Sequence, residues 1–135
     1  MASAAGGRLI VESATLDFGE GQLLIEARFS GLKLDPTRRV GLDVGGSMRW
    51  MRLEPSGGSG QRFATDGDDH DYSFSLDLER GRFIATDSTV RPLRHNPTIV
   101  KLEQGNSAAC VKLEFTEAGD RWTFDERRNR QLPCE

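Results

Sequence analysis

The chain has 135 residues, of which 36% are hydrophobic and 29% charged, and its formal net charge at neutral pH is −3. A single domain of this length buries about two-thirds of the surface that its unfolded chain exposes, so a core can form without metal or disulfide staples. The acidic total disfavours nucleic acid and anionic membranes as partners, and no run approaches the roughly 20 apolar residues that cross a bilayer.

Residues 1–7 predict a flexible leader without the basic and long apolar segments of a signal peptide, so we expect a cytoplasmic protein. The two cysteines agree with that compartment. Cys110 adjoins an alternating strand, and Cys134 lies one residue from the end of the sequence. A buried thiol and a tail thiol are therefore favoured, and a disulfide between the two cysteines is the alternative.

Apolar and polar side chains alternate without a break through residues 72–79, and similar patterns recur along the chain. Successive side chains on a strand point to opposite faces, so this alternation predicts strands with one buried and one solvated face. Glycine-containing turns separate consecutive strands. The predicted hairpins pair residues 9–18 with 23–29, 39–44 with 48–53, 72–79 with 82–86, and 99–103 with 109–116.

The segments between these hairpins are less regular. The Gly- and Ser-rich stretch 54–60 predicts a surface loop. Pro92 and Pro97 flank a segment that we expect along a sheet edge, because proline cannot donate to a strand ladder. Residues 121–125 alternate as a last strand, and residues 127–135 predict a charged C-terminal tail, for which a helix is an open alternative.

Eight or nine short strands, spaced about 8–15 residues apart, are typical of all-β proteins. We therefore expect an antiparallel β-sandwich or barrel of the jelly-roll or Greek-key kind, with residues 8–126 forming a single β domain. Apolar side chains of the predicted strands should form its core. They are Leu23, Ile25, Phe29, Val40, Leu42, Tyr72, Phe74, Leu76, Leu78, Val111, Leu113 and Phe115.

An acidic loop is the first candidate site. Asp66, Asp68, Asp69 and Asp71 place four carboxylates within six residues. Calcium takes six to eight oxygen ligands, and loops at the end of a β-sandwich can supply them. The loop therefore predicts a possible Ca²⁺ site, although its spacing differs from the EF-hand. A solvated turn is the alternative, and the sequence predicts no other cofactor.

A carbohydrate site is a second candidate, on a face that carries Trp122 and His95. An aromatic ring can stack on a sugar while neighbouring polar groups, such as those of Asn96 and Arg127, bind its hydroxyls. These residue types resemble the galectin site, which also uses His, Asn, Arg, Trp and Glu. That resemblance implies carbohydrate binding, and core packing of Trp122 is the alternative.

Residues 16–23 resemble the Asp-x-Ser-x-x-Gly segment of PilZ domains, small β-barrels that bind cyclic-di-GMP, and residues 34–44 and 111–116 are similar to other PilZ stretches. Gly19 stands at the serine position and Gln22 at the glycine position, and no Arg-x-x-x-Arg pair precedes them. That pair normally clamps the phosphates of the ligand. The resemblance therefore implies a barrel that does not bind the nucleotide.

No signature of catalysis is present. His70 and His95 are the only histidines, and neither falls in a zinc-binding spacing. The chain also lacks a GxSxG elbow, a P-loop and a dinucleotide fingerprint. We therefore expect that the protein is not an enzyme.

The remaining candidate is an interface. Met48, Trp50 and Met51 cluster near a glycine turn, and Met and aromatic residues are enriched in the cores of protein interfaces. We expect a non-catalytic binding or assembly module that acts through protein–protein contacts, either with a partner or with a second copy. Core packing of the three residues is the alternative.

Overall fold

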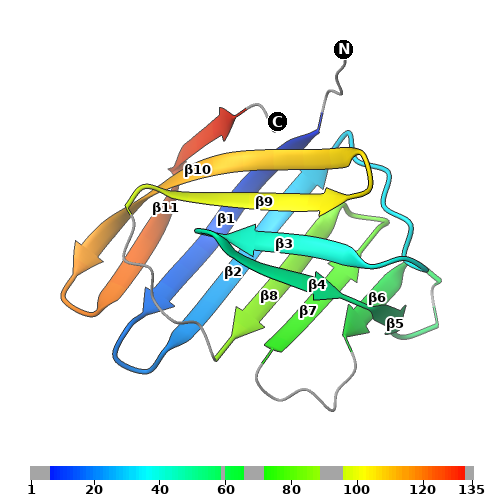
Figure 1. Cartoon of the computed structure of the whole chain (residues 1–135), viewed down its shortest axis with the longest axis horizontal. Helices are drawn as coiled ribbons and strands as arrows, with labels where there is room; N and C mark the ends of the chain where they lie inside the picture. Colours follow the sequence, from blue (N-terminus) through cyan, green and yellow to red (C-terminus); the bar gives the residue numbers. More distant parts are fainter. Residues whose placement is uncertain (1–6, 59, 66–71, 89–95, 133–135) are drawn as a thin grey trace.

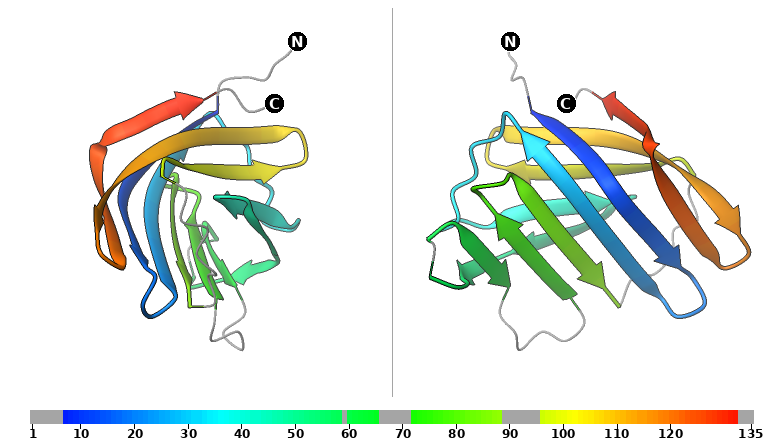
Figure 2. Two further views of the ribbon diagram at one scale, coloured as in Figure 1. Left: turned by 60° about the vertical axis from the view of Figure 1, so that its left-hand side comes forward. Right: turned by 180° about the vertical axis from the view of Figure 1, so that it is seen from behind.

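The computed structural model describes residues 7–58, 60–65, 72–88 and 96–132. These residues form one antiparallel sheet that curls into a nearly closed barrel (Figures 1 and 2), which confirms the all-β antiparallel class. The sheet has eleven strands, so the expected eight or nine was too low. They are β1 (Arg8–Asp17), β2 (Gln22–Ser30), β3 (Val40–Val44), β4 (Ser47–Met51), β5 (Leu53–Pro55), β6 (Arg62–Thr65), β7 (Tyr72–Asp77), β8 (Arg82–Asp87), β9 (Thr98–Gln104), β10 (Ser107–Ala118) and β11 (Arg121–Leu132).

The described part of the chain contains no helix that is long and apolar enough to cross a membrane.

The strands β5 and β6 were not expected: β5 takes in the first two residues of the predicted loop at 54–60, and β6 follows that loop. They have three and four residues, too few to show a periodic pattern. β5 ends in Pro55, which pairs with Phe63 of β6. A proline is tolerated there because β5 is the last strand of the sheet and has a neighbour on one side only.

The order of the strands explains the barrel shape. Across the sheet the order is β4-β3-β9-β10-β11-β1-β2-β8-β7-β6-β5. The two terminal strands, β4 and β5, are consecutive in the chain, and Arg52 alone separates them. One short segment therefore forms both edges of the sheet and holds them close together.

The turns of three hairpins are stabilised by the same contact, in which an aspartate side chain accepts a hydrogen bond from the backbone N–H three residues later. The pairs are Asp17–Glu20 at 3.0 Å, Asp43–Gly46 at 2.8 Å and Asp77–Arg80 at 3.1 Å. The turn after Asp77 ends at Gly81, whose φ of 64° is left-handed and whose Cβ, if present, would lie 2.7 Å from the Phe29 carbonyl oxygen. Asp17 of the PilZ-like segment thus stabilises its own turn.

Inward-facing side chains of the strands fill the barrel as one continuous core. Phe29 and Leu78 are partly buried against it, and all the other predicted core residues are buried. Within it the fully buried rings of Phe74 and Phe83, on the paired strands β7 and β8, stack with centroids 5.1 Å apart and an interplanar angle of 21°.

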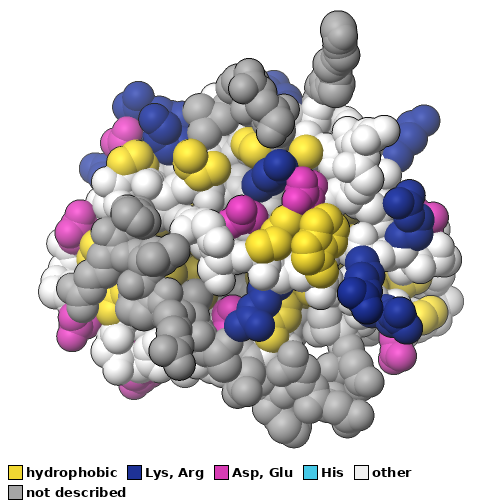
Figure 3. Space-filling view, in the orientation of Figure 1, with side chains coloured by type: hydrophobic (Ala, Val, Ile, Leu, Met, Phe, Trp, Pro, Cys, Tyr) yellow, Lys and Arg dark blue, Asp and Glu magenta, His cyan; other side chains and the backbone are white. Residues whose placement is uncertain are grey.

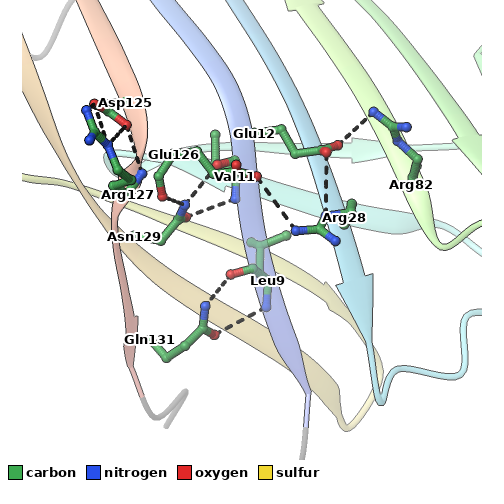
Figure 4. Close-up of polar contacts among 10 residues, drawn as sticks. All are labelled: Leu9, Val11, Glu12, Arg28, Arg82, Asp125, Glu126, Arg127, Asn129 and Gln131. Carbon is green, nitrogen blue, oxygen red and sulfur yellow. Dashed lines mark hydrogen bonds and ion pairs between the residues drawn. The ribbon is translucent and has the colours of Figure 1, made fainter.

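The segment from residue 127 onward, expected to be a charged tail, continues strand β11 as far as Leu132. Its backbone pairs with β10, where Asn129 lies opposite Leu113. Toward β1 the contact is made by side chains: the Asn129 amide both accepts from Val11 N–H and donates to Val11 C=O, each at 2.9 Å (Figure 4). Gln131 bonds the backbone of Leu9 in the same way. Residue patterns alone could not show that side-chain amides, and not backbone hydrogen bonds, would join this part of β11 to β1.

Cys110 is disulfide-bonded, so the expected thiol at this position is wrong. The register places Leu132 directly opposite Cys110, so the end of β11 lies beside the cysteine. The sequence did not indicate this proximity, because a tail was expected from residue 127 onward, where β11 instead continues beside β10. The one other cysteine of the chain, Cys134, lies outside the described residues.

Replacement of Phe74 by alanine should lower the free energy of unfolding by about 3–5 kcal/mol, because it opens a cavity in a fully packed core. The control is Ile84→Ala on the outer face, where the side chain is 46% exposed and the expected change is within about 0.5 kcal/mol. Urea unfolding measures both variants. Equal losses would contradict the core described above.

The disulfide of Cys110 should stabilise the fold by about 2–4 kcal/mol, chiefly by restricting the unfolded chain. A reducing agent should therefore lower the melting temperature of the wild type, and Cys110→Ser should lower it similarly and abolish the response to the reductant. A wild type that melts identically with and without reductant would contradict the assignment.

Candidate functional site

Strand β4 presents two different faces. Trp50 is 52% exposed, whereas the next residue, Met51, is 4% exposed and belongs to the core. Met48 and Trp50 share the outward face and lie over Gly41 of β3. A Cβ at Gly41 would lie 2.9 Å from the Trp50 ring and 3.1 Å from the Met48 methyl group. We call Met48, Trp50 and Gly41 the β4 patch.

The β4 patch separates the three predicted interface residues. Met48 and Trp50 lie together at the surface, while Met51 faces inward because side chains alternate along the strand. In the space-filling view, hydrophobic side chains gather over β3 and β4 with charged groups around them (Figure 3). The closeness of the three residues in the sequence predicted the cluster, but the alternation of side chains along β4 determines which of them solvent can reach.

Charged side chains border the β4 patch. On β3 and β9 the next outward positions are Asp43, Lys101 and Glu103, and the Lys101 ammonium lies 3.0 Å from the Glu103 carboxylate. Ile99, further along β9, is 48% exposed. An apolar centre with a charged rim is the usual anatomy of a protein interface.

The inward side of β4 carries a charge. Arg49 Nε lies 3.3 Å from Asp87 Oδ2, and the Arg49 guanidinium lies 5.4 Å from the centre of the Tyr72 ring. Asp87 and Tyr72 belong to β8 and β7, which are not neighbours of β4 in the sheet. The ion pair and the cation–π contact therefore connect the two sides of the barrel where no ladder does.

Tyr72 is 7% exposed and Asp87 is 4% exposed. Burial raises the pKa of the Tyr72 phenol well above its usual value, the negative charge of Asp87 raises this pKa further, and Arg49 opposes both effects. Beside these residues the interior leaves a cavity of about 10 Å³, which is about the space of a single water molecule. The described side chains in this part of the barrel therefore leave no chamber for an organic ligand.

The inward charge also affects the free edge of β4. Edge strands invite pairing with other chains, and inward-pointing charges are one of the ways in which native proteins prevent it. Arg49 is such a charge, held by Asp87. The outward β4 patch is therefore a better contact surface than the backbone edge of the same strand.

A charge network crosses the outer face of β1, β2 and β8 (Figure 4). Arg28 lies directly opposite Arg82, and like charges in that position destabilise a sheet. Glu12, at the bulge of β1, lies 3.5 Å from Arg28 Nε and 2.7 Å from Arg82 Nη2. The extra residue of the bulge thus places a carboxylate between two arginines.

Beyond this network a groove of about 450 Å³ opens over β6, β7 and β8. Three arginines line it, with apolar and hydroxyl groups between them. The residues are Ser56, Arg62, Phe63, Ser75, Leu76, Asp77, Arg80, Arg82, Phe83 and Ile84. We call it the arginine groove. Sequence reasoning missed it because its arginines converge only through strand pairing, where Arg62 and Arg82 both lie opposite Asp77.

The predicted calcium ligands Asp66, Asp68, Asp69 and Asp71 lie outside the described residues, as does His95. Within the part of the chain that the structure describes, no three His, Cys, Asp or Glu residues are grouped to hold a metal ion.

Two residues of the predicted carbohydrate face have structural contacts instead. Trp122 is 3% exposed, and its ring meets that of Phe18 at 4.7 Å. Asn96 uses its side-chain amide to bond both backbone groups of Phe115 at 2.9 Å. A buried ring offers no face on which a sugar can stack.

Comparisons with protein-family models, with curated proteins and with solved structures give no match to this chain.

Tyr72 is the only tyrosine, so the ultraviolet absorbance of tyrosinate reports on this residue alone. Its raised pKa means that above about pH 10 the unfolded chain releases a proton that the folded chain retains, so stability should fall as the pH rises. We expect tyrosinate absorbance to appear only as the protein unfolds. In Asp87→Asn, which removes one cause of the shift, ionisation should begin at lower pH; ionisation of the folded wild type near pH 10 would contradict the burial.

Proposed function

We propose that this protein is a non-catalytic binding module that contacts another protein, or a second copy of itself, through the β4 patch. The observation that carries the proposal is Trp50, a large aromatic side chain that is 52% exposed on a terminal strand of the sheet. Tryptophan is among the residues that contribute most to binding energy at protein interfaces.

The surface below Trp50 supports this role. The Trp50 ring rests against Gly41, so it is held against the sheet and loses little conformational freedom when a partner covers it. Burying the exposed half of a tryptophan should contribute roughly 2–3 kcal/mol at 25 cal/mol per Å². The neighbouring charges of Asp43, Lys101 and Glu103 would orient the partner rather than add much affinity.

Other binding modes have less support from the described residues. Side chains fill the interior, and the Arg49–Asp87 ion pair protects the edge of β4. The calcium alternative rests on residues outside the description, and the carbohydrate alternative rests on a buried Trp122. The proposal includes no catalytic step and no cofactor. The cysteines no longer support the expected cytoplasmic location, because Cys110 is disulfide-bonded and disulfides are rare in the cytosol.

The test replaces Trp50 by aspartate, which should abolish association without unfolding the protein because the side chain lies outside the core. Light scattering after gel filtration, over a range of concentrations, measures self-association. Co-purification from the native host measures other partners. The control is Ile84→Asp, which puts the same charge on an exposed apolar position of the opposite wall and should change neither result.

Acrylamide quenching of tryptophan fluorescence adds an independent measurement. Trp122 is buried and Trp50 is exposed, so the quencher reports mainly on Trp50. Association should protect this fluorescence in the wild type. If Trp50→Asp is folded and keeps the mass and the partners of the wild type, the β4 patch is not the interface.

A further inference from the structure

The arginine groove lies on the wall opposite the β4 patch. In Figure 1 the strands β3 and β4 lie in front of β7 and β8, and the view from behind in Figure 2 shows the outer side of β6, β7 and β8. A ligand in the groove would therefore not compete with a partner on the β4 patch. The arginine groove has a volume of about 450 Å³, which falls in the usual range for small-molecule sites.

The three guanidinium groups keep donors available. Arg62 uses Nε toward Asp77 at 3.7 Å, and Arg82 uses Nη2 toward Glu12 at 2.7 Å. Each guanidinium has five N–H donors, so both retain others. Arg80 has no ion pair among the described residues, although its backbone N–H bonds Asp77.

The groove is positive while the chain is negative. Three arginines and one aspartate line it, for a net charge of +2, against −3 for the whole chain. Asp77, the one carboxylate, is 21% exposed and already accepts a hydrogen bond from Arg80 N–H and contacts Arg62. Its charge is therefore largely satisfied by the groove itself, and Arg80 is the cation with the least compensation.

The rest of the lining is suited to an organic body. Ile84 is 46% exposed and Phe63 is partly buried, and both line the groove. The hydroxyl-bearing residues Ser56 and Ser75 line it as well. The lining therefore combines an apolar surface with arginine guanidinium groups and serine hydroxyl groups.

We propose that the arginine groove binds a small organic anion, with a phosphate or carboxylate head bound by Arg80 and Arg62 and an apolar body against Ile84. The planar fork of arginine matches both heads, because two parallel N–H groups can donate to two oxygens of one anion. This site is independent of the proposed protein contact at Trp50.

Titration calorimetry and NMR of the whole chain test the site with phenyl phosphate, benzoate and inorganic phosphate. Phenyl phosphate or benzoate should bind saturably, and the stronger of the two identifies the head group. Inorganic phosphate should bind more weakly, because it lacks the body that covers Ile84. Raising the salt from 0.05 to about 0.5 M should weaken binding, since exposed charges are screened.

Arg80→Gln should weaken binding about tenfold or more, through the loss of a charge-assisted fork. Since Arg80 has no ion pair among the described residues, the variant should fold like the wild type. The control is Arg8→Gln, an equal change of charge at an exposed position of β1, which should leave binding unchanged. Trp50→Asp should also bind normally, so the groove and the β4 patch are tested separately.

Absence of saturable binding by all three probes would overturn the proposal. So would equal effects of Arg80→Gln and Arg8→Gln, because they would show attraction to overall charge instead of a site. Stronger binding of inorganic phosphate than of phenyl phosphate would overturn the role of Ile84 in holding an apolar body.

Discussion

Both edges of the sheet come from one segment of the chain, and this connection forces the sheet to curl. The segment passes from β4 to β5 through Arg52, so the two ends of an eleven-stranded order must meet. No ladder joins β4 to β8 in that order. The Arg49–Asp87 ion pair crosses the opening instead, and the buried position of Asp87 makes removal of either partner costly.

The nearly closed sheet leaves its outer surface for the two proposed sites. The inward side chains pack against one another, and the space beside Arg49 is about that of one water. The two proposed contacts therefore use outward side chains, which alternate with the core residues on the same strands. On one wall these include Trp50 beside a charged rim, and on the other they form the arginine groove. Two chemically different surfaces thus share one core.

Part of the candidate interface was predictable from the sequence. Met48, Trp50 and Met51 are close in the chain, and their residue types are typical of contacts. Their separation into an exposed Trp50, a partly buried Met48 on the same outward face and a buried Met51 requires the orientation of β4, which a five-residue strand does not reveal by periodicity. The arginine groove was not predictable, because Arg62 and Arg82 are brought together by the register of β6, β7 and β8.

Most of the local structure was predictable from the residue pattern: the strands with a clear alternation, the turns that glycines such as Gly81 allow, and the core side chains of those strands. These properties depend on near neighbours and on the period of a strand. The strand order, the position of Cys110 beside the end of β11 and the amide contacts of Asn129 with β1 required the folded chain. Asn129 and Val11 are 118 positions apart in the sequence, and only the curled sheet brings them together. Cys110 meets the end of β11 because that strand continues beyond the alternating pattern from which it was predicted.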